Sequence, residues 1–406
     1  MRLRTVFFIY VLSTAAAVAA PYVMTAVENA QRKTISVNSE SPLESAPVLQ
    51  PRSLWGEAAP ACIALDGTIY HKNGMQSDWR DPGRTLRPFA RGNKEEFDSC
   101  AVSRDGTVYA IGQNRNRLWQ LSSYKPSGDL NWSIPTLELC SRPALDGNGI
   151  VYLVSREKRG TTILTAFRPD GSHLWETPIG GTGWYLTAPA IAANGDMYLA
   201  AASFTAPAQL VAISSKGREL WRIAVPHMMA GNGNGPIIGE DGRIFVQVAK
   251  GAAAFNEHGE KLWEFTSGNQ DTDGGIALGG DGILYVASRF LYALDKSGKP
   301  EWIFKSERTY TDRDDFSHHP LIAKDGTIYA NSYYEQLYAI TPDGRKKWVV
   351  NGEPTVMERA WGQPILTQGG TLVTNAGWFA VSSGLATAGW PTENHDNSNS
   401  RHQEKP

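Results

Sequence analysis

The sequence is poor in cysteine and has no excess of charge of either sign. Only 3 of the 406 residues are cysteine, so they cannot all pair within the chain, and a disulfide framework does not define the fold. The 39 Lys and Arg residues balance 41 Asp and Glu residues. This balance supports neither a polyanion-binding surface nor a disordered chain. Nucleic acid is therefore not an expected partner.

Short catalytic motifs are missing as well. The sequence contains no P-loop, no dinucleotide fingerprint, no zinc signature and no Ser-His-Asp order. The glycine-rich stretch from Gly231 to Gly235 precedes a β-rich run, so we interpret it as a loop. No residue type in the chain is singled out as a nucleophile.

Glycine and aromatic residues, by contrast, are abundant. The chain has 40 Gly, 13 Trp and 15 Tyr. Helical proteins avoid so much glycine, whereas sheets that are joined by tight turns and packed by aromatic rings use all three residue types. The composition therefore predicts an all-β protein.

The first 27 residues have the pattern of an export signal. Two arginines occur in the first four residues, and an uncharged stretch follows from Thr5 to Val27, with a small-residue cleavage pattern at Ala17 and Ala19. Residues 1–27 are predicted to be a signal peptide or an N-terminal membrane anchor. No cysteine follows that could carry a lipid. Both alternatives predict an exported protein, periplasmic or extracellular, that contacts a membrane only through this segment if the segment is not cleaved.

Residues 28–50 show no apolar period and are predicted to be a disordered linker. At the other end, residues 392–406 form a polar C-terminal tail.

The region between these segments contains an eightfold repeat. An Asp-Gly, Asn-Gly or Gly-Gly pair followed by a short β-rich run recurs every 39 to 47 residues, as in Asp66-Gly67 to Tyr70 and Asp325-Gly326 to Tyr329. Such pairs between apolar runs indicate a β-hairpin, and we expect a type I′ turn with positive φ at both central residues. Each repeat therefore opens with a hairpin.

A second signal follows inside most repeats. Leu-x-Ala-(Leu/Ile) precedes Gly-x-x-x-Trp, as in Leu291 to Trp302, which indicates a second hairpin. Four short strands in about 43 residues are typical of a propeller blade. We predict one eight-bladed β-propeller of four-stranded antiparallel blades over residues 51–391.

The ends of the repeat suggest how the ring closes. The last repeat lacks Gly-x-x-x-Trp, whereas Leu54-Trp55 stands alone before the first hairpin. We expect this pair to supply the missing outer strand of the last blade, with Trp390 as the alternative. The first repeat has Leu86-Arg87 where Leu-Trp is expected, so its blade should pack less tightly.

The Leu-x-Ala-(Leu/Ile)-x-x-x-Gly-x-x-x-Trp pattern resembles the PQQ-like β-propeller repeat family, over about residues 54–390. That family includes the quinoprotein alcohol dehydrogenases and the BamB type of outer-membrane assembly scaffold. In the family, the tryptophans dock against neighbouring blades. The resemblance therefore implies a structural docking role for Trp132, Trp175, Trp221, Trp263, Trp302 and Trp348.

The dehydrogenase branch implies a bound quinone (PQQ), a calcium ion and often a disulfide between adjacent cysteines. This chain has no adjacent cysteines and no Cys-x-x-Cys-His. No spacing groups its aspartates into the six to eight oxygen ligands that calcium requires. We therefore expect no cofactor, neither PQQ nor calcium.

Strand order indicates where a binding site would lie. If Asp-Gly turns join the first and second strands (A and B), and Gly-x-x-x-Trp turns join the third and fourth (C and D), both turn types share one face. The other face then carries the B to C and D to A connections, and the last residues of the D to A connections lie at the mouth of the central channel. The candidate binding residues there are Asp98, Arg142, Trp184, Tyr185, Asn234, Asp273, Asp315, His318, His319, Arg359 and Trp361.

Among these candidates, Trp184, Tyr185 and Trp361 are the residue types used as interface anchors or sugar platforms. His318 and His319 are adjacent on an extended segment and should point in different directions, so we expect no shared metal. We predict a monomeric, non-catalytic scaffold that binds a protein or peptide on the D to A face, one version being envelope or outer-membrane protein assembly. The alternatives are a carbohydrate-binding or carbohydrate-active propeller, or a quinone-dependent dehydrogenase, using the channel mouth.

Overall fold

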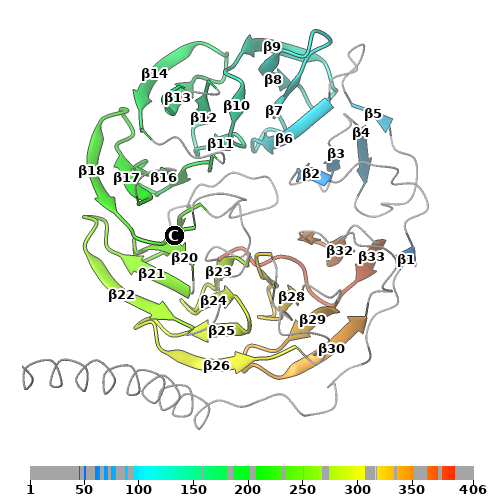
Figure 1. The fold of residues 1–406 in the computed structure, drawn as a ribbon. Helices are drawn as coiled ribbons and strands as arrows, with labels where there is room; N and C mark the ends of the chain where they lie inside the picture. Colours follow the sequence, from blue (N-terminus) through cyan, green and yellow to red (C-terminus); the bar gives the residue numbers. More distant parts are fainter. Residues whose placement is uncertain are drawn as a thin grey trace, which may run out of the picture.

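The computed structural model describes residues 45, 50–51, 60–64, 68–71, 75–78, 87–89, 96–157, 160–180, 186–201, 207–229, 235–249, 251–267, 274–306, 316, 318–332, 336–351, 364–373 and 377–388. Every regular element within them is a β-strand. The strands form eight antiparallel sheets around a central axis (Figure 1). The predicted all-β, eight-bladed propeller is therefore confirmed.

Each blade is numbered in chain order, and its strands run from A at the central axis to D at the rim (Figure 1). Blade 1 contains β2 (Pro60–Ile63), β3 (Thr68–His71), β4 (Met75–Asp78) and β5 (Arg87–Pro88). Blade 2 contains β6 (Glu96–Val102), β7 (Val108–Gln113), β8 (Trp119–Tyr124) and β9 (Leu130–Pro135). Blade 3 contains a divided A strand, β10 (Leu139–Cys140) and β11 (Ala144–Leu145), then β12 (Val151–Arg156), β13 (Ile163–Phe167) and β14 (His173–Pro178). Blade 4 contains β15 (Ala190–Ile191), β16 (Met197–Ala201), β17 (Gln209–Ile213) and β18 (Glu219–Ala224).

The remaining blades follow the same order. Blade 5 contains β19 (Ile237–Ile238), β20 (Ile244–Val248), β21 (Gly251–Phe255) and β22 (Lys261–Thr266). Blade 6 contains β23 (Ile276–Leu278), β24 (Leu284–Ala287), β25 (Leu291–Leu294) and β26 (Pro300–Phe304). Blade 7 contains β27 (Leu321–Ile322), β28 (Ile328–Asn331), β29 (Gln336–Ile340) and β30 (Lys346–Asn351). Blade 8 contains β31 (Ile365–Leu366), β32 (Thr371–Val373), β33 (Gly377–Ala380) and, as its outer strand, β1 (Gln50–Pro51).

The hairpin turns form where the sequence predicts them, but their type differs from the expected type I′. Only the glycine has positive φ, as in Gly195 with φ 87°. Its N–H donates to the carbonyl three residues earlier, Ala192, at 2.8 Å, and the Ala192 N–H donates to Asp196 O at 2.8 Å. The turn is therefore longer by one residue and ends in a glycine bulge. Only one left-handed residue is needed, which is why Asp, Asn or Gly can precede the glycine.

The two sequence signals meet in one row across each blade. In blade 4, Tyr198 on β16 lies opposite Ala212 on β17, which lies opposite Trp221 on β18. The two rings approach over the small alanine, with centroids 5.9 Å apart. Blades 2 to 7 all have such a ring pair, at 5.7–5.9 Å. The middle residue is alanine in blades 3 to 7 and Ser123 in blade 2, because a larger side chain would separate the rings.

Neighbouring blades are joined by the same tryptophans. The Trp175 indole N–H donates to Ser215 O in the C to D turn of blade 4, at 3.2 Å, and the ring lies against Gly217 of that turn. A Cβ on Gly217 would lie 2.6 Å from the Trp175 ring, so only glycine fits. The same indole-to-carbonyl bond is made by Trp132, Trp221, Trp263 and Trp302. Blades 2 to 6 therefore each supply a tryptophan to the next blade, and blades 3 to 7 each supply a glycine to the preceding one.

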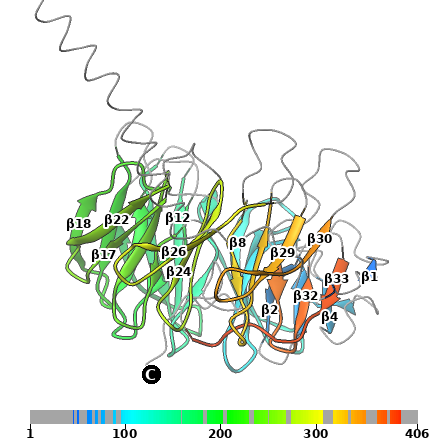
Figure 2. The same cartoon turned by 90° about the horizontal axis from the view of Figure 1, so that it is seen from below.

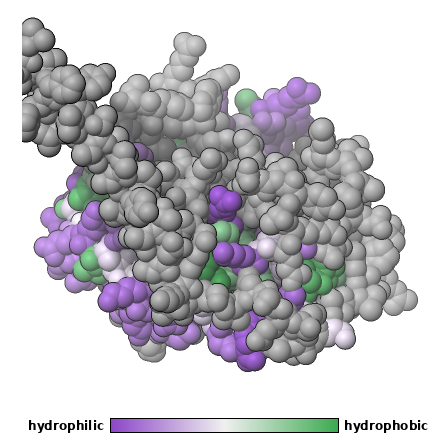
Figure 3. Space-filling view, turned by 60° about the horizontal axis from the view of Figure 1, so that its bottom comes forward, coloured by the Kyte–Doolittle hydropathy of each residue, from purple (hydrophilic) through white to green (hydrophobic). Residues whose placement is uncertain are grey.

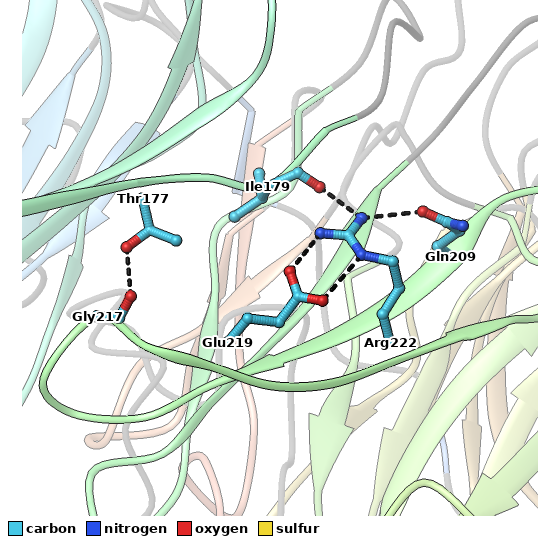
Figure 4. Close-up of polar contacts among 6 residues, drawn as sticks. All are labelled: Thr177, Ile179, Gln209, Gly217, Glu219 and Arg222. Atoms are coloured by element: carbon cyan, nitrogen blue, oxygen red, sulfur yellow. Dashed lines mark hydrogen bonds and ion pairs between the residues drawn. The ribbon is translucent and has the colours of Figure 1, made fainter.

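A polar contact supplements this docking between blades 3 and 4 (Figure 4). Arg222 on β18 donates to Ile179 O of blade 3 at 2.8 Å and to Gln209 Oε1 at 2.9 Å, and its Nη2 lies 2.6 Å from Glu219 Oε2. This hydrogen bond lowers the pKa of the Glu219 carboxyl. Thr177 also donates to the Gly217 carbonyl. The arginine is therefore held between two blades by three groups.

Blade 1 docks differently, because Arg87 stands where the other blades have tryptophan. A Cβ on Gly128, the turn glycine of blade 2, would collide with the carbonyl of Phe89 and not with an indole. The Phe89 side chain is 1% exposed. It packs edge-on against Tyr70 at 4.6 Å and Tyr124 at 5.6 Å. In addition, a disulfide joins Cys62 on β2 to Cys100 on β6, while Cys140 is a free thiol.

The ring closes through a strand from the N-terminal side, and the described part of this strand is Gln50–Pro51. Gln50 and Pro51 pair with Trp378 and Gly377 of β33. The predicted closing pair Leu54-Trp55 lies four residues further along, and it falls, like Trp390, outside the described residues. Gln50, expected as the last residue of the linker, is thus already part of blade 8.

The chain after β33 forms a further connection that the repeat does not predict. We call residues 381–388 the strap. Leu385, fully buried, bridges to Ala323 next to β27, and the Ala386 N–H donates to Ile322 O at 2.9 Å. The strap then reaches blade 6, where Ala388 lies against Gly280. It therefore crosses from blade 8 along the axis side of blade 7, on the face of the tight turns (Figure 2).

Candidate functional site

The two faces of the ring differ in their connections. One face carries the A to B and C to D turns, which are short and internally hydrogen-bonded, and the strap lies across it. The other face carries the B to C and D to A connections, as the sequence predicts. We call it the loop face. Of the predicted binding residues, Asp98, Arg142, His318 and His319 lie among the described residues.

Asp98 and Arg142 lie on the loop face of blades 2 and 3. Asp98 is exposed at a bulge in β6, between Phe97 and Ser99. Arg142 is exposed between β10 and β11. Both charges are therefore accessible to solvent and to a partner.

The free thiol of Cys140 lies on β10 of blade 3. Its Sγ is 3.3 Å from Thr136 Oγ1 and 3.2 Å from Leu137 O. Burial, with a smaller contribution from the Asp98 charge, raises the pKa of the Cys140 thiol to about 11. The thiol is therefore protonated at neutral pH and a poor nucleophile.

His318 lies on the loop face between blades 6 and 7. Its φ of 96° is positive, a conformation that is uncommon for a residue with a side chain. The Asn331 Nδ2 atom lies 3.0 Å from its Nδ1. The imidazole is half-buried, so part of it remains accessible.

His319, by contrast, is buried against the neighbouring blade. It is 5% exposed, and its Nδ1 lies 3.1 Å from Ile276 O of blade 6. A Cβ on Gly275 would lie 2.4 Å from the ring, so the imidazole occupies the space that this glycine leaves. The two histidines contact different blades, as their adjacency on an extended segment predicts.

A basic aromatic cluster on blade 6 was not predicted from the sequence. Phe290, in the B to C turn of blade 6, has Lys305 Nζ 4.9 Å and Arg289 Cζ 5.9 Å from its ring centroid. Lys305 is exposed, and Arg289 and Phe290 are half-buried. Arg289, Phe290 and Lys305 are called the loop-face patch below. Its signal in the sequence is the Arg289-Phe290 pair in the B to C connection, whereas the predicted binding residues all come from D to A connections.

The other predicted binding residues lie outside the described residues: Trp184, Tyr185, Asn234, Asp273, Asp315, Arg359 and Trp361.

The apolar surface does not form one continuous area on the described part of the molecule. Its exposed large apolar side chains are Leu118, Leu130, Leu220 and Leu262. In Figure 3, apolar residues form separate patches among hydrophilic ones. Isolated apolar residues of this kind are ordinary on a protein surface. Charged and aromatic groups of the loop face are therefore the better candidates for recognition.

Carboxylates suited to a calcium ion were looked for in the described part of the chain. Calcium requires six to eight oxygen ligands. Within the described ranges, no three His, Cys, Asp or Glu side chains gather closely enough to hold a metal ion.

In the same part of the chain, no helix is long and apolar enough to cross a membrane.

Comparison with known proteins gives one family. The profile of the family described as outer membrane protein assembly factor BamB matches residues 159–264 and 249–387, which is more than half of the chain. A search of curated proteins found no match.

Solved structures with a similar fold include propellers of different origin. BamB from Moraxella catarrhalis is 12% identical with a TM-score of 0.56, covering 82% of this chain and 100% of its own. Sqt1 from Saccharomyces cerevisiae is also 12% identical, with a TM-score of 0.55 and coverage of 84% and 100%. The propeller of Dos1 is 10% identical, with a TM-score of 0.55 and coverage of 81% and 94%. At these identities the similarity concerns the fold.

Proposed function

Because this chain belongs to the PQQ-like propeller family of the outer membrane protein assembly factor BamB, we propose that it is an exported, non-catalytic scaffold that binds a protein partner. The partner binds on the loop face, and assembly of outer-membrane or other envelope proteins is the process it serves. The observation that carries the proposal is the difference between the two faces. The strap crosses the turn face, whereas the loop face presents charged and aromatic side chains.

The loop-face patch indicates what kind of partner segment would bind there. Arg289 and Lys305 both lie near the same phenylalanine ring, at 5.9 Å and 4.9 Å from its centroid, which brings two cations close together. An acidic segment of a protein would be attracted by both charges and could pack an apolar side chain beside Phe290. Trp184, Tyr185 and Trp361 are proposed as further anchors on the same face.

Export is supported by the N-terminal sequence pattern and by the Cys62–Cys100 disulfide. Disulfides form and persist in oxidising compartments. The proposed location is the periplasm or the extracellular space.

Partner capture with matched charge reversals tests the proposal. The tagged full-length chain is cross-linked in its own envelope, and captured proteins are identified for wild type, R289E/K305E and K216E. Lys216 is an exposed residue in the C to D turn of blade 4, so it is a control on the other face. We expect R289E/K305E to lose the partner and K216E to keep it.

The opposite pattern would contradict the proposal. If both variants keep the same partner, or if only K216E loses it, the loop face is not the binding face. Binding of glycans instead of protein, lost on replacing Tyr185 and Trp361 by alanine, would favour the carbohydrate alternative.

A further inference from the structure

The junction between blades 1 and 2 differs at both its rim and its axis from the five described junctions between blades 2 and 7. At the rim, the turn glycine Gly128 lies against the backbone carbonyl of Phe89, where the C to D turn glycines of blades 3 to 7 lie against an indole ring. At the axis, the disulfide joins the A strands of the two blades, with Cα atoms 5.7 Å apart. Cys62 is 2% exposed and Cys100 is fully buried. The two differences occur at the same junction, which indicates that one compensates for the other.

The cysteines replace ordinary packing residues of the repeat. Cys62 lies opposite Tyr70, in the row that contains the conserved ring. The other blades have apolar residues at this position: Ala101, Ala144, Ala190, Ile237, Ala277, Leu321 and Ile365. Cys100 directly precedes Ala101. The corresponding residues of the following blades are Pro143, Pro189, Pro236, Ile276, Pro320 and Pro364. The pair is therefore specific to this junction of the ring.

Blade 1 is also the neighbour of the seam where the ring closes. Its first strand, β2, begins at Pro60, and the closing strand β1 ends at Pro51, only nine residues earlier. Blade 1 is therefore connected through a short segment of chain to the outer strand of blade 8.

We propose that the Cys62–Cys100 bond is a redox-dependent latch that holds blade 1 in the ring. In the oxidised protein, the bond fixes the A strands of blades 1 and 2 to each other. A dithiol reductant donates two electrons and two protons, the S–S bond breaks, two cysteine thiols form, and the reductant becomes a cyclic disulfide. Blade 1 then retains the Phe89 packing but loses its covalent attachment, and it opens locally while blades 3 to 6 stay folded.

Hydrogen exchange of the full-length protein, with and without dithiothreitol, tests the latch. Removing a cross-link between residues 38 positions apart should increase the opening of the segment by roughly 100-fold or more. We expect faster exchange after reduction in peptides that contain β2, β3 and β6. Peptides that contain β16 and β17 of blade 4 should exchange at the same rate in both conditions.

Two variants serve as controls. C140S removes the free thiol and should respond to dithiothreitol as wild type does. C62S/C100S should show the exchange pattern of the reduced wild type and no further response to reductant. Should the double variant not fold, reduction of the folded wild type provides the same comparison. Unchanged exchange in β2 and β3 after complete reduction, or an equal increase in all blades, would overturn the proposal.

Discussion

The contact between Trp175 and Gly217 permits a sharp test of how the blades are joined. Gly217 has φ 79°, and a Cβ there would lie 2.6 Å from two carbons of the Trp175 ring. Gly242 has the same φ of 79°, but a Cβ there would meet nothing within 4 Å. The two glycines therefore share their backbone conformation and differ in the packing around them. Replacing each by alanine separates these two contributions.

The expected magnitudes follow from this comparison. An alanine at positive φ costs about 1–2 kcal/mol of stability, so G242A should destabilise by that amount. G217A has the same cost and in addition pushes the indole out of its position, for which overpacking costs about 1–3 kcal/mol. We expect G217A to destabilise by about 2–5 kcal/mol, measured from the midpoint of urea unfolding. The Thr177 bond to the Gly217 carbonyl would be disturbed as well.

A double-mutant cycle isolates the packing contribution. In a W175L background, the indole is absent, so the additional cost of G217A should disappear and its effect should approach that of G242A. Equal destabilisation by G217A and G242A in the wild-type background would refute the interpretation. It would mean that the glycine is required by the turn and not by the tryptophan of the preceding blade.

Three further predictions concern titratable groups. The hydrogen bond to Arg222 lowers the pKa of Glu219, so the Glu219 carboxylate stabilises the fold above its unfolded pKa of about 4.5, and this stabilisation is lost as the pH falls. E219Q should therefore lower the midpoint of urea unfolding at pH 7 and not at pH 3. Equal shifts of the midpoint at both pH values would contradict this. Burial raises the pKa of Tyr109 and Tyr198 to about 12, so the folded protein should lose stability as the pH rises from 10 to 12. Y198F should reduce this loss of stability. Tyrosinate absorbance reports the ionisation of the tyrosines during the pH titration. Burial raises the pKa of the Cys140 thiol from 9 to about 11. Iodoacetamide at pH 8 should therefore modify Cys140 in the folded protein roughly 100-fold more slowly than in the unfolded protein. Equal rates of modification in the two states would show that the thiol is accessible.

The fold could be predicted because its signals are local and repeated. The tyrosine after Asp-Gly, the alanine of Leu-x-Ala and the tryptophan after Gly-x-x-x lie within one repeat, and they meet as one row, such as Tyr198, Ala212 and Trp221. The spacing alone therefore determines strand number and order. It did not determine the turn type, since an Asp-Gly pair fits both a two-residue turn and the longer turn with a glycine bulge.

Features that appear once in the chain were harder to predict. The strap carries no repeat signal in the sequence. The role of Leu385 in packing against blade 7 follows only from the structure, where it pairs with Ala323. Three cysteines allow three pairings, and composition does not choose among them. His318 and His319 differ by one position, yet one is half-exposed and the other is buried against Gly275. The loop-face patch required the structure, because Arg289 and Lys305 come from different connections of blade 6.

The closure of blade 8 also has a consequence for the order of folding. Its outer strand, β1, is among the first residues of the ring to leave the ribosome, and its partner β33 is more than 300 residues later. Each indole junction, in contrast, needs only the next repeat, so blades can join one after another as the chain emerges. Contacts between distant residues form slowly, and unpaired strand edges can associate with other chains. Closure of the ring therefore comes last. Until β33 is available to pair with β1, the blades form an open arc whose two end blades are unpaired and can associate with other chains.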